Sequence, residues 1–228
     1  MIAARTRQPF LVAVAAFALA LAAPAGAHPL GNFTINHLTE LTFSHGRAGL
    51  HYVLDMAEIP TYQAMRAATP DGKMTTEQLG AWARAQAQTL LPQLQLRAGD
   101  APIPLTLDVA AARTRPGAGG LPLIYLTLDA HGAIPASVRE INYRDTTFAG
   151  RIGWRDVVVA PASEPTHELL AYPNALLGSP RSLTGVAVTL ARDGHRVAVV
   201  DAPAIEDVPA AGAEAKVTEA ANGAASTL

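Results

Sequence analysis

The sequence predicts a mainly β fold of the α+β class, an antiparallel, immunoglobulin-like β-sandwich with an inserted two-helix segment. Three observations lead to this prediction. Runs in which apolar and polar residues alternate recur along the chain, and glycine and proline separate these runs at short intervals. One stretch, about 58–91, follows a helical period instead and forms the expected insert.

The first two strands are expected close to the beginning of the domain. From Asn32 to Phe43 apolar and polar residues alternate, and a period of two is typical of a half-buried strand. The face expected to be buried carries Phe33, Ile35, His37, Leu41 and Phe43. A turn at 44–47 and a second strand at 49–56 complete a hairpin.

Two helices are expected after this hairpin. Pro60 lies where a first helical turn tolerates proline, and residues 61–68 continue that helix. Thr75 and Gln78 have the spacing of a capping box, which begins the second helix. The apolar stripe of this helix contains Leu79, Trp82, Ala83, Ala87, Leu90 and Leu91. Pro92 is expected to end it.

The chain beyond Pro92 again has strand character. Candidate strands occupy 94–99, 103–109, 121–129, 138–145, 151–160 and 185–200. Within the last run, Asp193 and Gly194 are expected to form a tight hairpin turn. From residue 202 alanine, proline and acidic residues replace the apolar pattern, which predicts a flexible linker or tail over 202–228.

The first 27 residues have the organisation of a secretory signal peptide. Arg5 and Arg7 precede an apolar run at 11–23, and the small residues 25–27 follow it. This run is shorter than the roughly 20 residues that a spanning helix needs. We therefore expect cleavage after Ala27 and a mature N-terminus at His28. The resulting domain, 28–201, would be exported to the periplasm or outside the cell, with no membrane span left after cleavage.

Composition narrows the function further. The net charge is −2, which gives no basic footprint for nucleic acid or for an anionic membrane. The sequence contains no cysteine, so thiolate metal sites and cysteine nucleophiles are excluded. It contains no G-x-S-x-G, H-E-x-x-H or phosphate-loop motif, and we expect no enzymatic activity.

The residues between the two helices have the outline of a calcium-binding helix-loop-helix. If Gly72 takes the sixth loop position, ligand positions one, three, five and twelve fall on Ala67, Thr69, Asp71 and Gln78. Three of these four lack a carboxylate, whereas calcium needs several charged oxygen ligands. The sequence therefore argues against calcium here.

Two histidines are the first candidates for metal ligands. After cleavage, the α-amine and imidazole of His28 would close a chelate ring on a transition metal ion, and Pro29 removes the next backbone N–H. His37 falls on the buried face of its strand, where a core histidine satisfied by hydrogen bonds is the alternative. Asp55 and Glu58 are the secondary candidates.

Geometry decides whether the two histidines share a site. Nine extended residues would hold His28 and His37 roughly 30 Å apart, so they meet only if residues 29–31 turn the chain. The remaining histidines are His45, His131, His167 and His195, expected in turns or loops, and His51, expected in the second strand.

Three separated segments carry a resemblance to a known family. AHPLGNFTINH (27–37), YVLDMAEIPTYQ (52–63) and YRDTTFAGRIGWRDVVV (143–159) resemble the extracytoplasmic N-terminal domain in a branch of the bacterial nickel/cobalt transporter family. In such proteins this domain precedes the membrane helices of a permease. The similarity spans roughly 28–160, and the permease part is absent from this sequence.

The resemblance implies an accessory or sensor domain of a nickel/cobalt transport system, which captures metal or gates its passage. Its expected ligands are His28, His37, Asp55 and Glu58, for Ni(II) or Co(II), with Cu(II) as second choice. The expected partner is a membrane permease, as a separate chain or a missing C-terminal part. The alternative is a metal-free protein-interaction module that docks on the permease. This alternative predicts an exposed apolar or edge-strand surface at 32–43 and 143–154.

Overall fold

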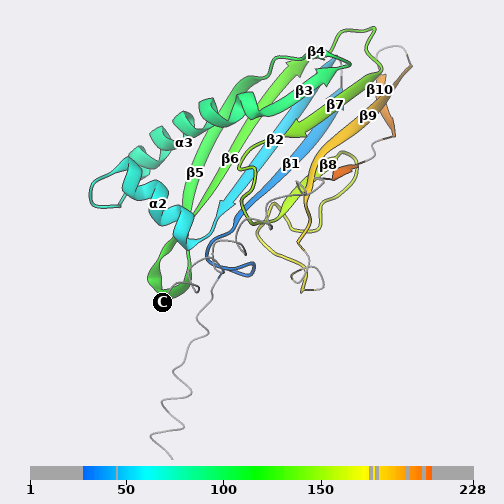
Figure 1. Cartoon of the computed structure of the whole chain (residues 1–228). Coiled ribbons are helices and arrows are strands. Elements are labelled where there is room, and N and C mark those ends of the chain that lie inside the picture. The colour runs from blue at the N-terminus through cyan, green and yellow to red at the C-terminus, as the bar shows by residue number, and fades with distance from the viewer. Residues whose placement is uncertain are drawn as a thin grey trace, which may run out of the picture.

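The computed structural model describes residues 28–44, 46–174, 177, 180–193, 196–201 and 204–206. The predicted signal peptide, most of the predicted tail, His45, His195 and Gly194 of the expected hairpin turn lie outside these residues. Within the described part the protein is mainly β, as the alternating patterns predict. Two helices follow the second strand (Figure 1).

One sheet contains, among the described residues, five strands in the order β5-β6-β2-β1-β8. They are β1 (Ile35–Ser44), β2 (Arg47–Met56), β5 (Thr106–Pro116), β6 (Pro122–Ala133) and β8 (Arg155–Val159). The predicted hairpin is formed by β1 and β2. In contrast, β8 pairs with β1 in parallel, so a wholly antiparallel arrangement is wrong at this pair. No short turn joins these two strands, and nothing local fixes their relative direction.

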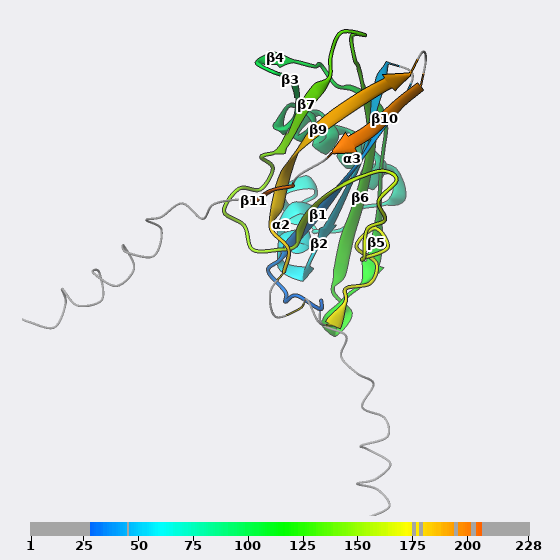
Figure 2. The same cartoon turned by 90° about the vertical axis from the view of Figure 1, so that its right-hand side faces the viewer.

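The second sheet runs β10-β9-β7-β3-β4, and its strands pair antiparallel. They are β3 (Leu94–Ala98), β4 (Ala101–Pro102), β7 (Glu140–Asp145), β9 (Leu183–Asp193) and β10 (Arg196–Asp201). A further strand, β11 (Ala204–Glu206), pairs with β9. In Figure 2, β9 and β10 lie in front of the first sheet. Because β11 pairs with β9, residues 204–206 belong to the folded domain, although the sequence analysis places them in the tail.

The helical insert consists of α2 (Glu58–Ala68) and α3 (Thr76–Leu90), followed by a 3-10 turn at Leu91–Gln93. The capping box is present: the Thr75 hydroxyl accepts from the Gln78 backbone N–H, and the Gln78 side chain accepts from the Thr75 N–H. In Figure 1, α3 runs alongside β5. Between the helices, Asp71 accepts a hydrogen bond from the Lys73 N–H, as a turn residue does.

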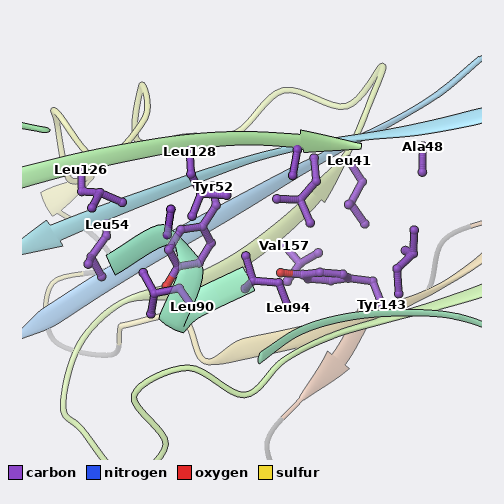
Figure 3. Close-up of a cluster of buried hydrophobic side chains, with 14 of the residues drawn as sticks. Leu41, Ala48, Tyr52, Leu54, Leu90, Leu94, Leu126, Leu128, Tyr143 and Val157 are labelled. Atoms are coloured by element: carbon purple, nitrogen blue, oxygen red, sulfur yellow. The ribbon is translucent and has the colours of Figure 1, made fainter. Parts of the chain in front are cut away.

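One buried cluster joins both sheets and the helices (Figure 3). The cluster contains every second residue of β2 from Leu50 to Met56, because side chains of a strand alternate between the two faces of the sheet. The Tyr52 hydroxyl bonds to Thr147, and the Tyr143 hydroxyl bonds to Thr39. Burial raises the pKa of both tyrosines well above its ordinary value, so each remains a neutral hydroxyl.

The opposite face of the five-stranded sheet carries a second, smaller cluster, which we call the outer cluster. It contains Leu38, Val53, Tyr125, Trp154, Val158 and Leu169. The segments that contribute Trp154 and Leu169 lie outside the strands, so loops cover this part of the sheet. The candidate site described below lies beside this cluster.

Several strand boundaries differ from the sequence prediction, and the start of β1 and the end of β5 differ in ways that have a physical reason. β1 begins at Ile35, and Phe33, expected on the buried face, is 64% exposed because residues 28–34 form turns before the strand. β5 continues to Pro116, well beyond the predicted end at residue 109. Its second half reads AAARTRP and has no apolar alternation, and pairing with β6 keeps it extended.

Candidate functional site around His28

His28, the predicted mature N-terminal residue, is only 4% exposed. A turn over Pro29 and Leu30 folds the chain back, with the Gly31 N–H donating to the His28 carbonyl at 2.8 Å. Gly31 has φ +100°, a conformation that glycine adopts readily and other residues rarely do. The turn on which a shared histidine site depends is therefore present.

Asp55, near the end of β2, lies at the centre of the site and is fully buried. Its Oδ2 atom lies 2.7 Å from His28 Nε2 and accepts from the Tyr172 hydroxyl at 3.0 Å. Its Oδ1 atom accepts from an Arg115 Nη atom at 2.5 Å. A buried carboxylate is stable only with such partners, so Asp55 ties three distant segments together.

The contacts of His28 define its tautomer. Nε2 at 2.7 Å from a buried carboxylate acts as the N–H donor, which leaves the lone pair on Nδ1. Nδ1 has two long contacts, the Leu30 N–H and the Thr34 hydroxyl, each at 3.3 Å. Asn36 lies beside the ring: its Oδ1 accepts from the Trp154 backbone N–H at 2.8 Å, and its Nδ2 donates to the Asp55 carbonyl at 3.3 Å.

Tyr172 is a neutral hydroxyl, and the Arg115 guanidinium lies near an aromatic ring. Burial, and then the neighbouring Asp55 charge, raise the pKa of Tyr172 far above its ordinary value, so the hydroxyl donates at any physiological pH. The Arg115 guanidinium lies 5.2 Å from the centroid of the Tyr125 ring, and that of Arg113 lies 4.4 Å from it. Both arginines therefore approach one aromatic ring beside the site.

A cavity of about 350 Å³ opens next to His28. Its wall contains His28, Arg115 and Tyr172 as polar residues. Its apolar lining consists of Pro29, Pro116, Leu123, Leu169, Leu170 and Ala171. The site is thus reachable by a small molecule, although His28 and Asp55 themselves are buried.

His37 does not join this site. It lies on β1 one residue after Asn36, so its side chain occupies the opposite face of the sheet from His28 and Asp55. Its Nδ1 lies 2.5 Å from Asp145 Oδ2, between the two sheets. The buried position predicted for His37 is correct, with 2% exposure. The chain turns at residues 29–31, yet the two histidines still belong to different sites.

The His37 pair is part of a buried polar network. Asp145 Oδ1 accepts from the backbone N–H and the hydroxyl of Thr147, at 2.8 and 2.6 Å. The Thr147 hydroxyl in turn contacts the Tyr52 hydroxyl at 2.8 Å. His37 Nε2 is buried and has no hydrogen-bond partner among the described residues. This arrangement resembles the alternative of a core histidine, but with a hydrogen bond at Nδ1 only.

Glu58 is also separate from the His28 site. It is buried at the start of α2, and its Oε1 atom accepts from the Ala118 N–H at 2.8 Å. Glu58 therefore fastens the β5–β6 turn to the helix. Its Oε2 atom has no hydrogen-bond partner in the described part of the chain. Of the four predicted ligands, only His28 and Asp55 are in contact.

The described residues contain no group of three or more His, Cys, Asp or Glu side chains that could hold a metal ion. His51 and His131 each pair with one aspartate, Asp129 and Asp108. His131 lies in β6 rather than in the expected loop, whereas His167 lies in a loop as predicted.

Sequence reasoning missed Arg115, Tyr172, Asn36 and Asp145. Arg113 and Arg115 have the spacing of two that places both on one face of a strand, which was the available signal. Tyr172 lies in a loop without periodicity and gave no signal.

No described helix is long and apolar enough to cross a membrane. Comparisons with models of protein families, with characterised proteins and with solved structures give no match.

Proposed function

We propose that the domain captures a divalent transition metal ion outside the cytoplasm for a nickel/cobalt transport system. His28 would be its primary ligand, through the α-amine created by processing and the imidazole Nδ1. The observation that carries this proposal is the buried hydrogen bond from His28 Nε2 to Asp55. Ni(II) and Co(II) are the expected cargo, with Cu(II) as second choice.

The His28 contacts suit this role. A metal-binding histidine commonly donates its second ring N–H to a carboxylate, which fixes the ring and strengthens the ligand. Asp55 takes that position here, so we assign it to orientation of the ring rather than to direct coordination. Nδ1, the ring atom that forms a chelate with the α-amine of the same residue, has only the two contacts at 3.3 Å to exchange for metal.

The proposal depends on a free α-amine at His28. Two nitrogen ligands from one residue would form a chelate and leave further coordination positions open, as suits capture followed by release. His37 and Glu58 have no part in this site, because each is engaged elsewhere.

Isothermal titration with Ni(II), Co(II), Cu(II) and Zn(II) tests the proposal. The full chain is exported and purified without a tag, and mass spectrometry confirms that the protein begins at His28. We expect binding of one metal ion per chain. A matched variant with one alanine inserted between Ala27 and His28 keeps every side chain but moves the α-amine, and it should lose the chelate.

Two substitutions sharpen the test. Asp55→Asn should weaken binding by about 10–100-fold, as expected for a residue that orients a ligand. His37→Gln should leave the affinity unchanged, because His37 lies on the other face. Binding that is equal in the unmodified protein and the alanine-insertion variant would eliminate the chelate.

The second candidate function is a metal-free module that docks on a membrane permease. Two exposed apolar side chains favour it: Phe33 and Ile152, which are 64% and 72% exposed. They lie in adjacent loops, since Ile35 N–H donates to the Ile152 carbonyl. The edge-strand version of this idea is wrong, because β1 lies between β2 and β8. Copurification of a permease with a His28→Ala/His37→Ala variant but not with Phe33→Ser/Ile152→Ser would favour docking.

We also propose that the two sheets form an immunoglobulin-like β-sandwich with a helical insert. The shared buried cluster and the position of α2 and α3 after the second strand support this interpretation. An experimental structure with the sheets packed face to face would establish the sandwich.

A further inference from the structure

The cavity beside His28 has the features of an anion site, which the metal hypothesis does not require. Arg115 contributes a guanidinium group to its wall. One Nη atom of Arg115 is used by Asp55, whereas the Nε atom is buried and has no hydrogen-bond partner among the described residues. A buried donor of a charged group without an acceptor is costly. The accessible part of the guanidinium, on a side chain that is 23% exposed, is where an anionic ligand would bind.

The Arg115 guanidinium is fixed before any ligand arrives. Asp55 holds it from one side, and its guanidinium group lies near the Tyr125 ring. Binding to a guanidinium group that is already ordered loses little side-chain entropy. This preorganisation is a property of a binding site rather than of a mobile surface arginine.

The local charge also favours an anion. Asp55 balances the charge of Arg115. A free α-amine at His28 would add one positive charge. Arg113, whose guanidinium lies 4.4 Å from the centroid of the same tyrosine ring, adds another. An opposing charge comes from Glu168, whose carboxylate lies 3.4 Å from the Tyr125 hydroxyl.

The size and lining of the cavity select the kind of anion. A volume of about 350 Å³ lies at the lower end of the range for small-molecule sites, roughly 300–1,000 Å³. Proline and leucine side chains form the rest of the wall, which suits a ligand with a carbon skeleton. A bare inorganic anion would leave those apolar surfaces uncovered.

We propose that this cavity binds a small organic carboxylate on the Arg115 guanidinium. The ligand would place one carboxylate against Arg115 and its carbon chain against the prolines and leucines. Such a carboxylate has two sources, a free organic acid or the acid portion of a metal chelate. The inference goes beyond metal capture, because the free acid would bind without any metal.

Isothermal titration of the exported full chain with succinate and citrate tests this inference in the absence of metal. Succinamide has the size of succinate without its charge, and inorganic phosphate has charge without a carbon skeleton. We expect saturable binding of a carboxylate and much weaker binding of both controls. The same titrations repeated with Ni(II) present distinguish the free acid from a chelate: tighter binding of citrate only with metal identifies the chelate.

Three variants locate the site. Arg115→Lys keeps the positive charge but removes the planar guanidinium group, and it should weaken carboxylate binding roughly tenfold or more. Ala171→Phe fills the cavity without changing any charge and should abolish binding. Arg113→Gln removes one charge from the same strand face at a residue outside the cavity wall, and it should have a smaller effect than Arg115→Lys. Thermal unfolding and circular dichroism verify that each variant is folded.

The inference is overturned if neither acid binds at concentrations up to about 10 mM, with or without Ni(II). It is equally overturned if succinamide binds as well as succinate, or if folded Arg115→Lys and Ala171→Phe bind like the unmodified protein. Failure of metal capture is a separate result, because it shows as absent binding of Ni(II), Co(II) and Cu(II) alone. Carboxylate binding without metal would leave the present inference standing.

Discussion

Substitution of Asp55 by asparagine is the most direct test of how the His28 site is stabilised. Asparagine has nearly the same shape, but it replaces a buried carboxylate by a neutral amide. Two of the three donors to Asp55, His28 Nε2 and the Tyr172 hydroxyl, meet at Oδ2, and Arg115 meets Oδ1. The single oxygen of an asparagine amide cannot accept from the donors at both Oδ1 and Oδ2, so at least one buried donor loses its acceptor.

The magnitude follows from these contacts. A hydrogen bond to a charged group contributes about 1.5–3 kcal/mol, and removing one partner of a buried ion pair costs about 3–5 kcal/mol. The Arg115 side chain is 23% exposed, so water compensates part of its loss. We therefore expect Asp55→Asn to lower the free energy of unfolding by about 2–4 kcal/mol.

Urea denaturation followed by tryptophan fluorescence measures this change, because Trp154 is packed against Tyr172 with ring centroids 5.8 Å apart. The matched control is Asp108→Asn. Asp108 pairs with Arg47 at 3.1 Å and with His131 at 2.8 Å, but the side chains of Asp108, Arg47 and His131 are 37%, 55% and 28% exposed. A surface pair of this kind is worth about 1 kcal/mol or less.

A double-mutant cycle isolates the ion pair. Arg115→Gln together with Asp55→Asn removes both charges, so the double variant should be less destabilised than the sum of the single variants. The reasoning is refuted if Asp55→Asn costs no more than Asp108→Asn. It is also refuted if the two effects in the cycle simply add.

Three further predictions follow from other parts of the fold. Asp145→Ala leaves His37 Nδ1 without its buried acceptor and should cost about 3 kcal/mol in urea denaturation; a cost below that of a surface substitution would contradict the network. Gly153→Ala should lower the free energy of unfolding by about 1–3 kcal/mol or more, because the new Cβ would lie 2.0 Å from the Ile35 carbonyl oxygen. Its control is Gly80→Ala in α3, where the new Cβ meets only ordinary contacts, and this variant should be more stable by up to about 1 kcal/mol. Burial raises the pKa of Asp156 above its ordinary value of 3.8, against the opposing hydrogen bond from Arg181. A raised pKa means that the folded state holds the proton more tightly, so the contribution of Asp156 to stability is largest below pH 3.8 and declines as the pH rises through the folded-state pKa. The stability of the unmodified protein relative to Asp156→Asn should accordingly fall as the pH rises above 3.8, and a difference that is flat or rises with pH would contradict this.

Local patterns in the sequence were sufficient for much of the fold. The hairpin of β1 and β2, the capping box at Thr75 and the end of α3 before Pro92 follow from neighbours within a few residues, and the structure confirms each. The burial of His37 also follows from strand alternation alone. These features depend on backbone geometry with periods of two and 3.6 residues, which the sequence displays directly.

Only the tertiary structure determined what the candidate site contains. His28 meets Asp55 across 27 residues, and Arg115 and Tyr172 join it from 60 and 117 residues away. No local pattern encodes such contacts, because they depend on how β5, β2 and a loop after β8 come together. The same argument explains why His28 and His37 are apart although the chain turns between them. The alternation of side chains along a strand assigns a residue to one face of a sheet only if the residue belongs to that strand. His37 belongs to β1, but His28 precedes it and is held against the sheet by its contact with Asp55, which is a tertiary contact.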